Sequence, residues 1–386
     1  MQLSIHNIYS LKTGDFQKQL QSCIRQIIDG VLGEGTDRRK VKITVFTSCS
    51  DNSDYVKKLN LLNHVLSQYN DFQAPASLVS QTPMDCGTLM EVWILDDVGS
   101  ACTFQFNRSE RTSVLHIDGP QFGCLFSTHV SAKHPIFKEN VSETFGLLDT
   151  TLKEWSFNYN EIVRQWNYIE NIIHYDTVKD SRIQNYQIFN DMRSIFYEKS
   201  NFTNGYPSAT GIGTVNGGCT IEMIALKEKT TNSVKPVANS MQIDAHSYSS
   251  NLLVGNAIEE IRKVSTPKFE RGKYMQIGKE GFLFISGTAS IIGEQTVFSG
   301  DVLKQTTTTL QNIDNLISMN NLNKNNINSF SQPRLLNYRA YLKNEKDYSI
   351  VKSLCDAYFG MDKGFIVKAD ICRDNLLVEI EANYVA

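Results

Sequence analysis

The amino-acid sequence predicts an α+β fold, in which mixed sheets carry helices packed on one face. Helical and strand-like patterns alternate through the first part of the chain. The last third runs strand, helix, strand, helix, strand, strand. The chain has 386 residues, 41% of them hydrophobic, which is enough to bury one large core or two modest ones.

The first elements follow from the spacing of apolar residues. Residues 16–31 and 55–66 place apolar side chains at helical spacing, which predicts two helices. Between them, residues 41–47 alternate and are rich in β-branched side chains, a pattern typical of a strand. Three further strands are predicted, at residues 91–95, 101–106 and 113–117.

The middle of the chain predicts two helices and a loop. Residues 161–174 and 186–197 are predicted to be helical. Residues 204–213 are rich in glycine and uncharged, which predicts a loop before a strand at residues 220–226. A short polar stretch at residues 176–181 predicts the boundary between a domain 1–178 and a domain 179–386.

The last third has the clearest pattern. Asp301 is placed to cap a helix that follows a strand at residues 281–285. A strand, a second helix and two final strands are predicted at residues 335–342, 348–359, 365–372 and 376–384. In the final strand Glu379 and Glu381 share one face. If the apolar residues between them face a core, Glu379 faces a site or solvent.

Charge and cysteine content exclude several classes of protein. Lys and Arg number 38 and Asp and Glu number 41, so the net charge is −3, which argues against nucleic-acid and anionic-membrane binding. The N-terminal residues show no signal peptide and no window resembles a membrane span, so we expect a cytoplasmic protein. The eight cysteines form no C-x-x-C pair and the seven histidines are scattered, so we expect reduced thiols and no metal site.

Several motifs of the last third resemble those of RidA-type (YjgF-like, chorismate mutase-like) domains. They are Ser286-Gly287-Thr288, Gly300-Asp301-Val302, Gln305-Thr306 and Val378–Ala382. The proteins of that group are trimers whose ligand sites lie between subunits. Their deaminases use an Arg near the penultimate strand to hold a carboxylate. Here that strand begins Gly364-Phe365-Ile366, so the resemblance does not extend to imine deamination.

A larger set of motifs resembles the chorismatases. The motifs occur in order from about residue 164 to the C-terminus: Arg164–Tyr168, Tyr186 to Arg193, Gly205–Gly213, Pro267–Arg271, Ile285–Ile291 and Ala369–Arg373 with Glu379. That family removes the enolpyruvyl group of chorismate as pyruvate, without a cofactor. The resemblance implies two RidA-like halves, a homotrimer, chorismate as substrate and neither cofactor nor metal.

The resemblance also implies a set of site residues. Glu379 is the acid/base, and Cys372 is grouped with it as a residue that shapes the pocket and need not be a nucleophile. Arg suits the carboxylates of chorismate because its planar fork binds them in a bidentate way. The implied substrate-binding residues are Arg271, Arg193, Tyr186, Tyr206, Thr210, Gly211, Gly287 and Ser286. Tyr248 is a further pocket candidate, and Arg164 with residues 166–168 is expected to join the halves.

The resemblance also implies a type of product, and two alternative functions are kept beside it. Gly287 and Cys372 resemble members that form 3-hydroxybenzoate, since hydrolysing members tend to carry Ala at both places. The first alternative is a hydrolase of the same fold that releases pyruvate and a dihydrodiol. The second is a non-catalytic RidA-like protein that binds a carboxylated metabolite, in which Glu379 would be an ordinary strand carboxylate.

Overall fold

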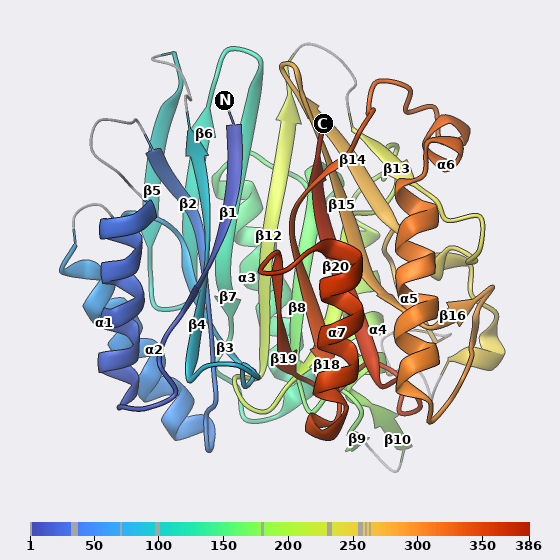
Figure 1. Ribbon diagram of the computed structural model, residues 1–386, viewed down its shortest axis with the longest axis horizontal. Coiled ribbons are helices and arrows are strands. Elements are labelled where there is room, and N and C mark those ends of the chain that lie inside the picture. Colours follow the sequence, from blue (N-terminus) through green and yellow to red (C-terminus); the bar gives the residue numbers. More distant parts are fainter. Residues whose placement is uncertain are drawn as a thin grey trace.

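Three large sheets with helices on their outer faces form most of the structure (Figure 1), and two further sheets have only two strands each. The computed structural model describes residues 2–31, 38–69, 72–96, 101–178, 181–229, 234–253, 258, 261 and 264–386. Each large sheet belongs to one stretch of the chain, so we call the three stretches the first, second and third unit. The α+β class and the packing of helices on one face of each sheet are confirmed.

The second and third units share one connectivity. Apart from a short two-stranded hairpin in each and the additional short helix α6 in the third, each runs through three strands, a helix, a strand, a second helix and two strands. The second unit consists of β5 (Thr103–Arg108), β6 (Ser113–Asp118), β7 (Phe122–Ser131), α3 (Phe137–Glu154), β8 (Ile162–Glu170), α4 (Asn185–Tyr197), β11 (Ser208–Thr214) and β12 (Cys219–Glu228). The third consists of β13 (Lys235–Val237), β14 (Gly272–Ile277), β15 (Glu280–Ala289), α5 (Val302–Ile317), α6 (Met319–Lys324), β18 (Arg334–Leu342), α7 (Tyr348–Phe359), β19 (Gly364–Lys368) and β20 (Val378–Val385).

The strand orders show the same relation. The second sheet has the order β11-β8-β12-β7-β6-β5, and the third has the order β13-β14-β15-β20-β18-β19. The second order, read from β5 to β11, matches the third order, read from β13 to β19, strand by strand. In this match β7 corresponds to β15, β12 to β20, β8 to β18 and β11 to β19. In both sheets the two strands that follow the helices, β8 with β11 and β18 with β19, pair in parallel.

The first unit is a smaller version of the same arrangement. It consists of β1 (Gln2–Tyr9), α1 (Phe16–Gln26), β2 (Arg38–Thr47), α2 (Asn52–Ser67), β3 (Ala76–Ser80) and β4 (Thr88–Asp96), in the sheet order β1-β4-β2-β3. This order matches four of the six strands in each larger unit and lacks the two outer ones. The described chain therefore holds two six-stranded units of the expected kind, preceded by a related four-stranded unit.

The predicted boundary at residue 178 falls inside the second sheet. Strands β11 and β12 follow residue 178 in the chain, yet both pair with β8, which precedes it. The sheets instead group the described chain as 2–96, 103–228 and 235–385. The polar stretch at residues 176–181 belongs to a hairpin of β9 (Tyr175–Val178) and β10 (Ser181–Gln184); residues 179 and 180 lie outside the described part.

Two predicted elements of the middle are wrong. Residues 161–174, predicted to be helical, form the strand β8, which lies between β11 and β12 and is buried along almost its whole length. A strand buried on both faces shows no alternation, so its apolar residues imitate helical spacing. The predicted glycine-rich loop contains β11, where a Cβ at Gly213 would stand 2.7 Å from the Asp370 backbone oxygen and one at Gly211 would stand 3.1 Å from the Tyr186 ring. Its first half, residues 204–207, is irregular.

The helices of the last third begin and end as predicted. The Asp301 side chain accepts a hydrogen bond from the Lys304 N–H and caps α5, and α7 ends at Gly360. The helices α1, α2 and α3 cover the first and second sheets in the same way, although α3 was not foreseen. Figure 1 shows α1 and α2 at one end of the molecule and α5 and α7 at the other.

The cores follow this layering. Each unit has an outer core between its helices and its sheet, and a central core lies where the three sheets face one another. Aromatic residues of all three units meet there. The indole of Trp93 lies 5.8 Å from that of Trp166 and 6.3 Å from the ring of Phe284. Large aromatic surfaces buried at such a junction hold the units together.

Six buried charges also lie between the sheets, and we call them the charge ring: Lys42, Glu91, Arg164, Glu222, Arg339 and Glu381. Each cation pairs with the carboxylate of the next unit. Lys42 Nζ lies 2.6 Å from Glu222, and Arg164 Nη2 lies 2.8 Å from Glu381. Arg339 Nε donates to Glu91 over 2.8 Å. The ring contains three charges of each sign and is fully removed from solvent.

The ring keeps the carboxylates of Glu91 and Glu381 ionised. Burial alone would raise the pKa of Glu91 and Glu381, but Arg339 and Arg164 outweigh it, and both pKa values lie below the usual range. Trp166 lies within 4.6 Å of the Lys42 ammonium and the Arg164 guanidinium. Arg164 and Trp166 therefore join units, as the sequence predicted.

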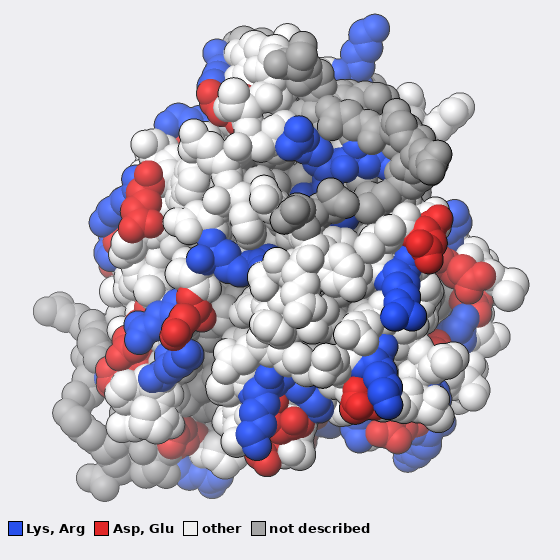
Figure 2. All heavy atoms as spheres, turned by 90° about the vertical axis from the view of Figure 1, so that its left-hand side faces the viewer, with Lys and Arg blue, Asp and Glu red and all other residues white. Residues whose placement is uncertain are grey.

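The surface is consistent with the low net charge. On the face at the α1 and α2 end, basic and acidic side chains lie beside one another across much of the area (Figure 2). All eight cysteines are free. Among the helices of the described part, none combines the length and apolar character needed to span a membrane.

The charge ring leads to a prediction about stability. Arg339→Met leaves Glu91 without its main partner, so the free energy of unfolding should fall by about 3–5 kcal/mol. The matched control is Lys153→Met, which breaks the exposed pair of Lys153 with Asp149 and should cost less than about 1 kcal/mol. Urea unfolding followed by tryptophan fluorescence measures both. Equal costs for the two variants would contradict the role assigned to the ring.

Candidate active site

A pocket lies between the second and third units. The second unit contributes the start of α4 and one face of β11, including Tyr186, Asn190 and Gly211. The third unit contributes β15, the segment before β14 and the segment that leads into β20. Of the residues predicted from the sequence, six line this pocket: Tyr186, Gly211, Arg271, Gly287, Cys372 and Glu379. Tyr248 lines it as well.

Glu379 lies at the floor of this pocket on the inner face of β20. Its neighbours Val378 and Ile380 pack in the outer core with α5 and α7, so Glu379 and Glu381 face the other units. Only 5% of Glu379 is exposed. Burial, reinforced by the nearby charge of Glu381, raises the pKa of Glu379 to about 8. A carboxyl with this pKa is mostly protonated at neutral pH and can donate a proton.

Gly287 makes room for the Glu379 carboxyl. It lies in a bulge of β15, where the register against β20 shifts between Ile285 and Thr288. A Cβ atom at residue 287 would stand 2.0 Å from Glu379 Oε1. A larger residue would therefore displace the carboxyl.

Two guanidinium groups line the pocket around one aromatic ring. Arg271 and Arg373 lie 5.5 Å and 5.3 Å from the centre of the Tyr248 ring. Arg271 Nη2 donates to the Tyr248 hydroxyl over 2.6 Å, and its Nε has no hydrogen-bond partner among the described residues. Arg373 Nη1 donates to the Glu294 carbonyl over 3.0 Å. The two cations make the pocket suitable for an anion with more than one acidic group.

Tyr186 and Cys372 form the opposite wall. The Tyr186 ring lies 3.1 Å from the position of a Cβ at Gly211, so the ring lies flat against β11. Burial raises the pKa of the Cys372 thiol to about 12, despite a hydrogen bond with Tyr186. The thiol therefore stays protonated and is a poor nucleophile. It shapes the wall, in line with the sequence-based interpretation.

Four predicted residues lie outside the pocket lining. Arg193 is buried behind the wall, where its Nη2 donates to Asn190 Oδ1 over 2.6 Å. The Tyr206 ring packs against Phe202, 4.7 Å away between centroids. The hydroxyl groups of Thr210 and Ser286 are held by hydrogen bonds within the protein.

Thr210 and Gly211, which were predicted to lie in a loop, lie in a strand instead. Both residues belong to β11 and pair with β8 in register, so this backbone is part of a sheet. Arg193 remains of interest because it is a buried cation whose Nε has no hydrogen-bond partner among the described residues. Burial lowers its pKa.

The sequence did not single out some lining residues. Arg373, Pro267 and Phe269 face the pocket, and all three stand inside motifs that were used for the resemblance. Asn190 lies one helical turn before Arg193 on α4. The signal that could have found Arg373 is its place directly after Cys372.

An acid at this position occurs at one interface only. Glu381, Glu222 and Glu91 occupy corresponding places in the three sheets, so Glu379 corresponds to Thr220 in the second unit and to Leu89 in the first. The position of Gly287 corresponds to His129, which lies in the equivalent bulge of β7. A larger cavity, of about 1480 Å³, lies between the first and second units beside α2 and α3, but it has no equivalent acid.

One group of potential metal ligands lies near the pocket. Among the described residues, Asp244, His246 and Glu270 bring ligand atoms within 4.8 Å of one another. The Glu270 carboxylate already accepts from the Tyr206 N–H over 2.9 Å. His246 Nε2 lies 3.8 Å from Glu270 Oε1, and this carboxylate raises the His246 pKa. An ion pair accounts for this group without a metal.

Comparisons with known proteins agree with this geometry. The family described as "Chorismatase FkbO/Hyg5-like, N-terminal" matches residues 103–225, and the family described as "Endoribonuclease L-PSP" matches residues 268–385. The first range coincides with the second unit, and the second range lies within the third unit.

Individual relatives cover more of the chain. A 3-hydroxybenzoate synthase of Streptomyces hygroscopicus is 27% identical over 299 residues, which are 75% of this chain and 80% of that protein. A chorismatase of Streptomyces rapamycinicus is 27% identical over 231 residues, 58% of this chain and 64% of that protein, so the match spans less than two thirds of it. The crystal structure of a chorismatase has the same fold, with a TM-score of 0.71 at 20% identity over 99% of each chain.

Burial of Glu379 leads to a prediction about stability and pH. Its pKa is about 8 in the folded protein, against an ordinary value of 4.5, so the folded state binds the proton more tightly than the unfolded state. The stability from this group is complete below pH 4.5 and is lost as the pH rises toward 8. Gln cannot ionise, so Glu379→Gln should gain stability relative to the parent by up to about 1.4 kcal/mol per pH unit over that window.

Urea unfolding between pH 5 and pH 9 measures this difference. The control is Glu143→Gln, which makes the same chemical change at an exposed carboxylate on α3. If the Glu379→Gln and parent curves run parallel, Glu379 is not a buried acid with a raised pKa.

Proposed function

Because this chain belongs to the chorismatase family, we propose that it cleaves chorismate to pyruvate and 3-hydroxybenzoate without a cofactor. The observation that carries the proposal is the Glu379 carboxyl, which is buried at the junction of two units and held in its proton-donating form. The name of the Streptomyces hygroscopicus relative supports the product type.

Binding begins with charge. Chorismate carries two carboxylates, and the pocket contains the guanidinium groups of Arg271 and Arg373. We assign one or both carboxylates to these groups, because the Nε of Arg271 has no other partner among the described residues. Arg193 contributes positive potential from behind Asn190 and would reach the ligand only if that wall moved. The flat ring of Tyr186 offers a surface for the ring of the substrate.

Cleavage begins with a proton transfer. The side chain of chorismate is an enol ether, which breaks after its terminal methylene takes up a proton. Protonated Glu379 supplies that proton, and the resulting oxocarbenium-like centre makes the ether oxygen a leaving group. The carboxylate that remains is stabilised by Arg164 and Arg271, whose charges oppose the raised pKa of Glu379.

The carboxylate then acts as a base. As the C3–O bond to the departing pyruvate breaks, the C4 hydroxyl oxygen bonds to C3 and its proton passes to Glu379. When the C4–O bond of this epoxide opens, Glu379 returns the proton to the oxygen and removes the ring proton at C3, which makes the ring aromatic and restores the protonated acid. All atoms of chorismate are divided between pyruvate and 3-hydroxybenzoate, so no water is consumed. Burial of the site supports this course over hydrolysis, since water has little access to Glu379.

Two alternative functions would use some of the same residues. A hydrolase would use the same acid but admit one water, which would give a dihydrodiol. A binding protein would use the cations alone; the raised pKa of Glu379 favours catalysis over this role.

Oligomeric state and location stay predictions. The resemblance implies a homotrimer, the sequence predicts a cytoplasmic location, and the pocket itself is formed by two units of one chain.

The function is tested by incubating the protein with chorismate. We expect pyruvate and 3-hydroxybenzoate in equal amounts by chromatography. The kcat should fall as the pH rises above about 8, where Glu379 loses its proton. Glu379→Gln should lower kcat about 10³-fold or more while chorismate still binds, and Glu143→Gln should keep full activity. Pyruvate with a diol would support the hydrolase, and binding without pyruvate would support the metabolite-binding protein.

The product type is tested at Gly287. In Gly287→Ala the new methyl group meets Glu379 Oε1, so the carboxyl must shift, and kcat should fall about 10- to 100-fold. We also expect a larger share of the dihydrodiol, more so with Cys372→Ala added. Gly146→Ala is the control, because a Cβ at this position in α3 meets nothing within 4 Å. Unchanged rates and products in Gly287→Ala would refute this role of Gly287.

A further inference from the structure

The hydroxyl group of Thr210 has three hydrogen-bond partners and no free capacity. It accepts from Arg164 Nη2 over 2.7 Å and from the Gly287 N–H over 3.1 Å, and it donates to Glu381 Oε2 over 2.5 Å. A hydroxyl has one proton and two lone pairs, so these contacts saturate it. Thr210 is fully buried and lies outside the pocket lining, so it does not contact a substrate there.

The contact with Gly287 links Thr210 to the proposed acid. Gly287 lies in the bulge of β15, between residues that pair with Ala382 and Ile380 of β20. In such a bulge the extra residue is left out of the ladder, and Thr210 Oγ1 is the acceptor of its N–H. Since the Glu379 carboxyl rests against Gly287, the position of the bulge sets the position of the acid.

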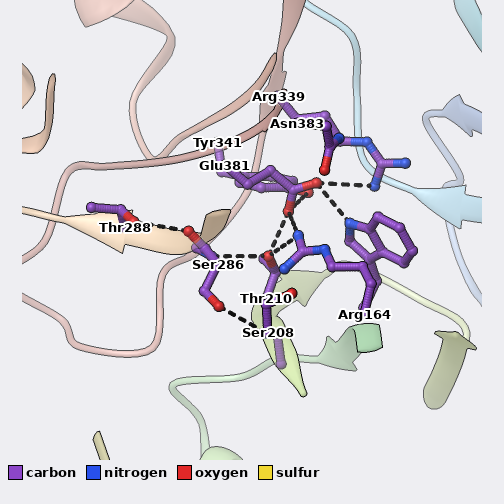
Figure 3. Close-up of polar contacts among 12 residues, drawn as sticks. Arg164, Ser208, Thr210, Ser286, Thr288, Arg339, Tyr341, Glu381 and Asn383 are labelled. Carbon is purple, nitrogen blue, oxygen red and sulfur yellow. Dashed lines mark hydrogen bonds and ion pairs between the residues drawn. The ribbon is translucent and has the colours of Figure 1, made fainter. Parts of the chain in front are cut away.

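The contacts with Arg164 and Glu381 link the same hydroxyl to the charge ring. Figure 3 shows Arg164 and Thr210 converging on the Glu381 carboxylate, with Ser286 on the side of β15. Glu381 and Arg164 act on Glu379 with opposite signs. The titratable and charged groups that face Glu379 are Glu381 from β20, Arg164 from β8, Arg271 beside β14, Tyr186 from α4 and Cys372 beside β19.

The other two interfaces lack this link. The position of Thr210 corresponds to Ser77 on β3 and to Phe365 on β19. The Ser77 hydroxyl donates to Glu222 in the same way, but no acid corresponds to Glu379 there. Phe365 carries no hydroxyl. The combination of ring contact, bulge contact and acid is therefore specific to the interface that holds the pocket.

We propose that Thr210 is a positioning residue, whose hydroxyl couples the charge ring to the Gly287 bulge and so holds the Glu379 carboxyl in its reactive place. This rests on the proposed function of Glu379 as the acid. It replaces the earlier expectation that Thr210 binds substrate. Loss of the hydroxyl frees the Gly287 N–H, and the carboxyl moves away from the enol ether.

The test uses two reciprocal variants. Thr210→Val keeps the shape and removes the hydroxyl, so kcat for chorismate should fall about 10- to 100-fold with KM changed less than about threefold. Thr210→Ser keeps the hydroxyl and removes the methyl group, and should recover kcat to within about threefold of the parent. If the Ser variant loses as much kcat as the Val variant, the residue acts through packing and the proposal fails.

A matched control distinguishes a positioning role of Thr210 from a general destabilisation of the charge ring. Ser77→Ala removes the corresponding contact to Glu222 at the interface of the first and second units, so it should lower the melting temperature while kcat and its pH profile stay unchanged. A loss of kcat in Ser77→Ala as large as that in Thr210→Val would overturn the proposal. If Thr210→Val does not fold, Thr210→Ala, in which a water can fill the space, takes its place in every comparison.

A second measurement does not depend on turnover. Carbon-13 NMR of labelled Glu side chains, with Glu379→Gln for assignment, follows the titration of Glu379 directly. In Thr210→Val the Glu379 midpoint should move from about 8 toward the ordinary carboxyl value, as the group relaxes toward solvent. An unchanged midpoint would refute the proposal. Absence of pyruvate from the parent protein would refute the proposed function instead, and the titration would still decide the role of Thr210.

Discussion

The charge ring between the three sheets is the constraint on which the rest of the structure depends. Six charges are buried where the units meet, and each would be costly without its partner. Every cation belongs to one unit and pairs most closely with a carboxylate of the next. The ring is therefore complete only when all three units dock in one arrangement, so it fixes how the units are placed against one another. The aromatic core around Trp93 and Trp166 supplies the apolar contact between them.

The same ring makes the pocket chemically unusual. Glu379 lies two residues from Glu381 on the same face of β20. The cations of the ring are already committed to other carboxylates, so none pairs directly with Glu379 among the described residues. Burial and the neighbouring negative charge then raise its pKa. A buried carboxyl left without an ion-pair partner is a poor structural element and a good proton donor, and the stability lost at high pH is the counterpart of that reactivity.

Repetition of one architecture explains where the site can form. Three sheets of related connectivity create three interfaces, but their side chains differ. One interface combines an acid, a glycine in a bulge and two guanidinium groups. The others have Thr220 or Leu89 at the position of the acid, and His129 stands where Gly287 would be in the second unit. Differences in the residues at these corresponding positions therefore distinguish the interface that holds the proposed acid from the two interfaces that join units without one.

The sequence by itself determined the elements whose pattern is local. The helices of the last third, the cap at Asp301 and the shared face of Glu379 and Glu381 follow from periodicity and capping within a few residues. Motifs in order along the chain also brought Arg271, Gly287, Cys372 and Glu379 into one hypothesis. Tertiary structure alone decided that residues 162–170 and 208–214 are strands, because burial on both faces removes the alternation that marks a strand. It also decided the three-unit division and the Glu379 environment, since pairing between distant strands and charges from neighbouring units leave no trace in local spacing.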